Sequence, residues 1–195
     1  MKRNFVAPLA AGTLLALAVP FAAQAESSLN TGSGALSTNA RVDFQITIPK
    51  FVSLRVGTAG APIDQVQFNV PAADVGTGTD VAGTGGDAGP GAVNARVLAN
   101  GGNVTLTAAT LGALSNGAGT TIDWTQVIST SSAPALTPPA LSNTTASVTL
   151  PATLGVVSQS AVWTYTYAND NVVAGGTYGG VGLNNGRVTY TASVL

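Results

Sequence analysis

The stretch Arg41-Val-Asp-Phe-Gln-Ile-Thr-Ile-Pro49 alternates between apolar and polar residues. Successive side chains of a β-strand point to opposite faces, so its apolar side chains would share one face. Such a strand can complete the sheet of its own chain or the sheet of another molecule. These apolar residues are Val42, Phe44, Ile46 and Ile48.

The same kind of alternation, punctuated by Gly, Pro and Asn, recurs along the chain. It predicts nine short strands, at residues 42–48, 51–56, 64–70, 93–99, 103–108, 121–128, 145–150, 161–167 and 187–194. Asn100-Gly-Gly102 predicts a hairpin turn between two of them. Short strands without a helical pattern indicate an all-β fold. We predict an antiparallel immunoglobulin-like β-sandwich with an N-terminal extension strand.

Residues 1–25 have the pattern of an export signal. Lys2 and Arg3 precede a largely apolar run over residues 5–21, and Ala23-Gln-Ala25 is a small-x-small cleavage site. We therefore expect a bacterial protein that is exported to the periplasm and then to the cell surface or the extracellular space. No later segment predicts a transmembrane helix.

The remaining chain divides into an arm and one domain. Residues 26–40 are rich in Ser, Gly, Asn and Thr, which predicts a flexible arm. Residues 41–195 make the predicted β-sandwich domain, with residues 41–56 as its candidate exchangeable strand.

The charge inventory argues against nucleic-acid binding. After the signal, eight acids and five cations remain, for a net charge of −3. So few scattered cations cannot neutralise a row of phosphates. The cations are Arg41, Lys50, Arg55, Arg96 and Arg187.

The composition also argues against an enzyme. The chain has no histidine and no cysteine, which removes an imidazole base, a thiolate nucleophile and their metal sites. Lys50 is the sole lysine after the signal, and the acids lie mostly in predicted loops or on polar strand faces. We expect neither catalysis nor a cofactor.

Two binding alternatives remain for a monomeric exported domain or matrix protein. Asp74, Asp80 and Asp87 lie in a Gly-rich loop that faintly resembles a calcium-binding repeat, so they are weak candidate Ca²⁺ ligands. The aromatic residues could stack on a sugar, although at strand spacing they are more often core residues. They are Trp124, Trp163, Tyr165, Tyr167, Tyr178 and Tyr190.

The two ends of the chain resemble a known family. Ala174-Gly-Gly-Thr-Tyr-Gly-Gly-Val181 is followed by an alternating terminal strand, Gly186-Arg-Val-Thr-Tyr-Thr-Ala-Ser-Val-Leu195. With the export signal, the arm and the alternating stretch at residues 42–48, this pattern is similar to the pilin-like subunits of chaperone–usher fimbriae.

The resemblance implies a function and partners. Such subunits have an incomplete sandwich that a neighbour's N-terminal strand fills, and they build adhesive surface filaments. A periplasmic chaperone holds the last strand before an outer-membrane usher exports the subunit. By this resemblance Val42, Phe44, Ile46 and Ile48 form the strand-exchange face. The strand that lines the groove or faces the chaperone carries Val188, Tyr190, Ala192 and Val194.

Three features depart from that family. The chain has no cysteine for the disulfide that many pilins carry, and Val194 stands where they have a penultimate aromatic residue. The turn Gly182-Leu-Asn-Asn-Gly186 predicts a hairpin between residues 177–181 and 187–194. That hairpin would leave no strand missing. Residues 42–48 would then form the first strand of a complete monomer.

Overall fold

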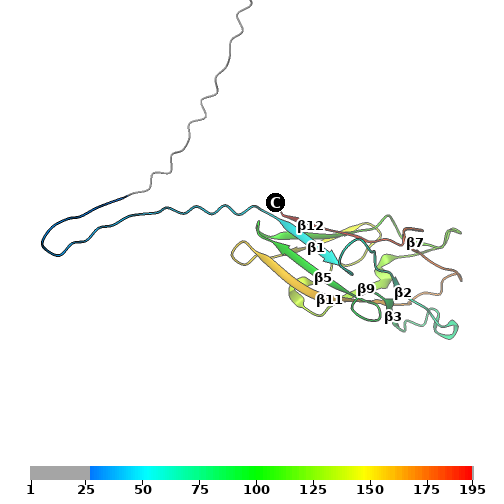
Figure 1. The fold of residues 1–195 in the computed structure, drawn as a ribbon. Helices are drawn as coiled ribbons and strands as arrows, with labels where there is room; N and C mark the ends of the chain where they lie inside the picture. Colours follow the sequence, from blue (N-terminus) through cyan, green and yellow to red (C-terminus); the bar gives the residue numbers. More distant parts are fainter. Residues whose placement is uncertain (1–26, 195) are drawn as a thin grey trace, which may run out of the picture. The chain divides into compact units, whose positions relative to one another are not determined.

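The structure is a computed structural model, and it describes residues 27–194. The predicted export signal, residues 1–25, lies outside the described residues. The chain divides into two compact units, Met1–Ile48 and Pro49–Leu195 (Figure 1). We call the second unit the body.

Two antiparallel sheets form the body, which confirms the predicted all-β sandwich. The larger sheet has the order β1-β5-β11-β3, and β9 also pairs with β11. The second sheet has the order β10-β6-β12. The larger sheet contains β1 (Val52–Val56), β3 (Val81–Ala82), β5 (Ala92–Ala99), β9 (Val127–Ser131) and β11 (Val157–Tyr167). The second contains β6 (Val104–Ala109), β10 (Thr145–Leu150) and β12 (Thr189–Val194).

Short elements complete the body. Residues 27–194 contain three 3-10 turns and no α-helix, so in this part of the chain no helix could cross a membrane. Two small ladders join β2 to β4 and β7 to β8. These elements are β2 (Val66–Gln67), β4 (Thr84–Gly85), β7 (Leu114–Ser115), β8 (Thr121–Ile122), η1 (Ala72–Asp74), η2 (Trp124–Gln126) and η3 (Pro134–Leu136).

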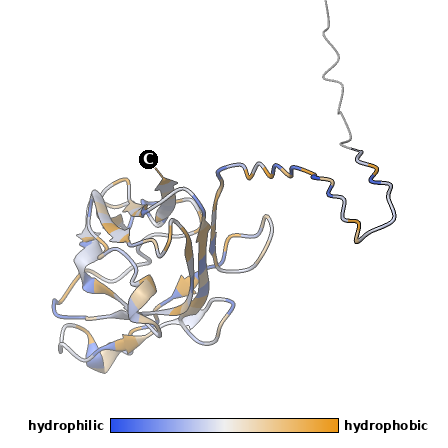
Figure 2. Cartoon of the chain, turned by 90° about the vertical axis from the view of Figure 1, so that its left-hand side faces the viewer, coloured by the Kyte–Doolittle hydropathy of each residue, from blue (hydrophilic) through white to orange (hydrophobic). Residues whose placement is uncertain are grey.

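The core lies between the two sheets, because alternate residues of their central strands point inward. Val97 of β5 and Leu106 of β6 are fully buried. So is Trp163 of β11, whose indole N–H donates to the Leu136 carbonyl at 2.8 Å. Figure 2 shows apolar and polar stretches side by side on the strands of the body.

The hairpin predicted at residues 100–102 is wrong. β5 pairs with β1 and β11, whereas β6 pairs with β10 and β12. Both edges of each strand are therefore occupied by other strands, and residues 100–102 cross from one sheet to the other. The turn residues signalled a reversal correctly but could not specify the sheet to which the next strand belongs.

The hairpin predicted between residues 177–181 and 187–194 is also wrong. Residues 182–185 do make turns, but residues 177–181 form no strand. The Gly179 N–H instead donates to the Ser115 carbonyl at 2.9 Å, and β12 pairs with β6. The last strand therefore has no neighbour from the preceding segment.

Two other predicted strands are shorter or interrupted in the structure. The ladder within residues 64–70 is limited to Val66–Gln67. Residues 121–128 are interrupted by η2, because the Trp124 N–H is held by the side chain of Asn143 at 2.9 Å.

Candidate functional site

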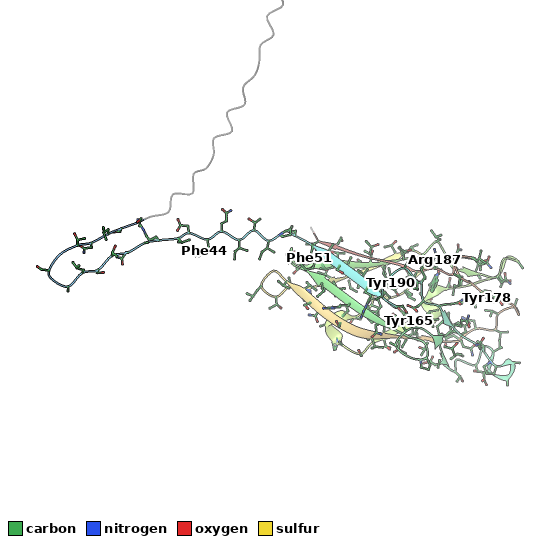
Figure 3. All side chains as sticks on the ribbon, viewed as in Figure 1. Phe44, Phe51, Tyr165, Tyr178, Arg187 and Tyr190 are labelled. Carbon is green, nitrogen blue, oxygen red and sulfur yellow. The ribbon has the colours of Figure 1, made fainter. Side chains whose placement is uncertain are left out.

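The alternating stretch at residues 42–48 belongs to no ladder in the described chain. We call it the donor segment. Its largest apolar side chain, that of Phe44, is 89 % exposed (Figure 3). Val42, Ile46 and Ile48 are between 73 % and 85 % exposed. Large apolar side chains in such a row are a feature of surfaces that other molecules cover.

The last strand, β12, has an edge that no other strand occupies among residues 27–194. It pairs with β6 in the register Thr189↔Ala109 to Val194↔Val104, and it ends the β10-β6-β12 sheet. In an antiparallel strand about half of the backbone N–H and C=O groups point away from the existing partner. β12 can therefore accept one more strand by hydrogen bonding.

The side chains of β12 supply an apolar lining beside this edge. Tyr190, Ala192 and Val194 alternate with exposed residues, and together with Val188 they pack against the core. All four are only half-buried. The structure thus places the four residues predicted for the groove on one inward-facing row, and that row is incompletely covered.

The first strand of the body, β1, lies beside the open edge of β12, and we call the region between these two strands the opening. Cα atoms of β1 and β12 approach within 8 Å, although the two strands share no ladder (Figure 1). Leu54 and Val56 of β1 are half-buried against the core. A strand bonded to both neighbours needs about 9.6 Å between them, twice the usual strand spacing. Where β1 and β12 approach within 8 Å, they are too close for a strand that is hydrogen-bonded to both.

The opposite side of the sandwich is closed. The segment between β9 and β10 crosses from the larger sheet to the second one, and it buries Leu136 and Leu141 in the core. The Ser131 hydroxyl donates to the Leu136 carbonyl at 2.9 Å and helps hold this crossing. The sandwich therefore lacks cover mainly along β1 and β12.

A small pocket marks one end of this opening. Lys50, Phe51, Val52 and Val194 line a cavity of about 260 Å³. The side chains of Lys50 and Val194 both lie against Gly101, where an added Cβ would meet each of them at 2.8 Å. The start of β1 and the end of β12 therefore lie close together.

Tyr190 connects β12 to the core through its ring and its hydroxyl group. The ring lies 5.2 Å from that of Trp163, measured between centroids. The hydroxyl lies 3.0 Å from the Tyr165 hydroxyl. The pKa of Tyr190 is raised well above its ordinary value of 10.0, mainly because the side chain is buried and secondarily because Tyr165 lies next to it. Burial also raises the pKa of Tyr165, although its bond to Tyr190 opposes this.

Asn100 fixes the chain where the body begins. Its amide nitrogen donates to the Pro49 carbonyl, and its carbonyl oxygen accepts from the Phe51 N–H, both at 2.8 Å. Sequence reasoning assigned Asn100 to a turn and missed this role. The sequence predicted residues 41–56 as one candidate exchangeable strand, whereas Val52–Val56 form β1 and pair with β5 within the body.

Among the three weak calcium candidates, the Asp87 side chain and the Asp74 backbone carbonyl have local hydrogen-bond partners. The Asp87 carboxylate accepts from the Asn94 backbone and side chain, at 2.7 and 3.1 Å. The Asp74 carbonyl caps η1 by accepting from Thr77. Asp80 is exposed, and nowhere in residues 27–194 do three acidic side chains gather closely enough to hold a metal ion.

The aromatic residues make no exposed stacking platform. Trp124, Trp163, Tyr165 and Tyr167 are buried, and Tyr178 and Tyr190 are half-buried. A second cavity, of about 220 Å³, is small for an organic ligand. It is lined by Thr121, Ile122, Asp123, Gln126, Tyr167, Asn171 and Val173.

Comparison of the chain with protein-family models, with curated proteins and with solved structures finds no match.

Proposed function

We propose that this protein is the structural subunit of a bacterial surface filament, assembled when the donor segment of one copy docks on β12 of another. One observation carries the proposal. Within residues 27–194 the chain contains an exposed amphipathic segment that belongs to no ladder, and also a sheet edge whose apolar row is only half-covered. Each feature supplies what the other lacks.

Chain direction favours pairing between copies over pairing within one chain. β12 ends at Val194 beside Lys50, and the donor segment ends at Ile48, two residues before Lys50. A chain's own segment that lay along its β12 would run parallel to it. Antiparallel pairing would put Ile48 at the Thr189 end, about 20 Å from its bonded neighbour Pro49, which a 3.8 Å Cα step forbids. A second copy has no such constraint.

The expected free energy is sufficient for a stable polymer. Burying one large apolar side chain contributes about 1.5–3 kcal/mol, so four contribute about 6–12 kcal/mol before ordering costs are subtracted. The row of backbone hydrogen bonds to β12 adds to this and selects the register. No disulfide is required, which agrees with the lack of cysteine.

Export and assembly partners belong to the same proposal. An uncovered edge on β12 would aggregate in the periplasm, so a chaperone that covers this strand until a donor segment arrives is expected. An outer-membrane usher would then pass the subunits to the cell surface. The proposed role is structural and needs no cofactor.

The proposal is tested by changing one side chain of the donor segment. Phe44→Asp places a charge on the buried face, so it should weaken docking by more than about 100-fold. Purified wild-type filaments should give a ladder of multiples in an unheated detergent gel and a single band after boiling. The variant should give the single band under both conditions.

Gln45→Asp is the matched control, because Gln45 lies on the opposite face of the segment. It introduces the same charge one residue away and should keep the ladder. An identical gel for Phe44→Asp and wild type would contradict the proposal, as would a wild-type protein that remains a monomer at every concentration.

A further inference from the structure

No spacer separates the donor segment from the body. The segment ends at Ile48, and the next residue, Pro49, is already held by Asn100. At about 3.3 Å per residue, the segment spans about 23 Å and β12 about 20 Å. A docked segment therefore covers β12 from end to end. In the antiparallel orientation, the body of the copy that donates the segment begins next to Thr189, the first residue of the acceptor's β12.

The body has two ends that matter for this geometry. We call the end where β1 begins and β12 finishes the near end, and the end where β6 finishes and β12 begins the far end. Figure 3 shows Phe51 at the near end and Tyr178 toward the far end. All ladders of the described body are antiparallel. A donor segment antiparallel to β12 brings its own near end to the far end of the acceptor.

The far end carries exposed apolar side chains that nothing in the described body covers. Leu111 is 86 % exposed, and Val181 and Leu183 are about two-thirds exposed (64 % and 65 %). Their loops are joined, since the Ser115 N–H donates to the Asn184 carbonyl at 2.9 Å. The Asn185 amide donates to the Ala113 carbonyl at 3.0 Å. We call these three apolar residues the far patch.

The near end carries a second group. Leu154 is 99 % exposed at the tip of a turn with positive φ, where a large apolar residue is unusual. Phe51, Val52 and Val156 are about half-exposed. The Gly102 N–H bonds to the Gly155 carbonyl at 3.1 Å, which holds this turn at the start of β6. We call these four apolar residues the near patch.

We propose that the near patch of each copy packs against the far patch of the copy that accepts its donor segment. This contact rests on the proposed strand exchange, which brings the two patches together. The two patches differ, so the contact is head-to-tail, the class of interface that extends into a filament when the rotation between copies does not close a ring. It would set the angle between successive subunits and make the filament stiff.

A small apolar contact is enough in this setting. Once the donor segment has docked, the patches belong to one assembly, and their effective concentration reaches the millimolar range that short connections produce. The contact therefore forms between linked copies although free bodies would not associate through it. The apolar ends are exposed in separate copies and become covered when the polymer forms.

The absence of cysteine makes a clean cross-linking experiment available. Two full-length single variants, Leu154→Cys at the near patch and Leu183→Cys at the far patch, are assembled together and oxidised. Boiling in detergent without reductant separates docked strands but keeps disulfides. A dimer band is expected from the mixture, whereas neither variant alone should give one.

Ile128→Cys provides the matched control, because Ile128 is a similarly apolar, 42 % exposed residue on β9. Mixed with Leu154→Cys, it should give no dimer. Unheated ladders without a Leu154–Leu183 cross-link would overturn the end contact and leave strand exchange intact. Loss of the wild-type unheated ladder would overturn both. A dimer from either single variant would overturn the head-to-tail arrangement.

Discussion

Tyr190 shows how one side chain can serve the core and the open edge together. Its ring packs on the buried Trp163, and its hydroxyl meets that of Tyr165. The residue belongs to β12, so the strand proposed to accept a partner is attached to the core of the sandwich. A loosely held edge would lose more conformational entropy when the donor segment docks.

This pair predicts a loss of stability in alkali. Burial raises the pKa of both Tyr165 and Tyr190 above 10.0, the ordinary value at which tyrosines of the unfolded chain lose their protons. The folded state holds more protons above that pH, so its stability is complete below about pH 10 and falls as the pH rises further. Urea unfolding at a series of pH values from 8 to 11 measures the slope.

The double variant Tyr165→Phe with Tyr190→Phe removes both ionisable groups. Changing both avoids leaving one buried hydroxyl without its partner. Its stability should decline less steeply above pH 10 than that of the wild type. Equal slopes in the two proteins would show that other groups control alkaline unfolding.

At the scale of elements, β12 and the donor segment are complementary in length and pattern. Both alternate, and they extend over similar distances. An antiparallel partner of β12 can also be supplied by the same chain if it follows β12 directly. A two-residue Asn-Gly turn is the connection that suits such a hairpin.

A rearranged chain is therefore expected to be a stable monomer. It lacks residues 27–48 at its start and carries residues 41–48 after residue 195, joined by Asn-Gly. The apolar face of the added strand should fill the opening beside β12. Compared with the same chain without the addition, the melting temperature should rise by about 10 °C or more. Calorimetry and sedimentation measure the two properties.

The control for this rearrangement keeps the Asn-Gly turn but begins the added strand at residue 42 instead of residue 41, which shifts its pairing with β12 by one residue. The shift turns the polar face inward, because side chains alternate with a period of two. It should give no comparable rise. A rearranged chain that melts at the temperature of the truncated one would show that β12 does not accept this segment.

At the scale of the whole molecule, the proposal gives each copy one donating part and one accepting part. All residues of the hydrophobic core, and those packed against it, lie within the body. The body without residues 27–48 retains the accepting edge but cannot donate. Added to the full chain, it should end each growing filament that it joins, so the ladder should shorten as its proportion rises.

The matched control is the same truncated body with Ala192→Asp. Ala192 lies on the inward row of β12, so a charge there blocks acceptance as well. This second body should leave the ladder length unchanged at every ratio. Equal effects of the two bodies, or no shortening by the first, would contradict filament growth through β12.

Local pattern was enough to predict several strands closely. Residues 93–99, 103–108 and 145–150 were expected as strands and correspond to β5, β6 and β10 within one residue at each end. Turn residues were less informative. Asn100-Gly-Gly102 indicated a turn but not that the chain changes sheet there, because strand pairing depends on residues distant in sequence.

By itself the sequence determined an antiparallel all-β protein without histidine or cysteine, and one strand-like segment with four apolar residues on one face. These properties follow from side-chain period and composition, which are local. Tertiary structure alone decided that, among residues 27–194, this segment pairs with no strand and β12 keeps an open edge beside β1. An edge is open or closed only through the choice of pairing partners, and no local pattern contains that choice.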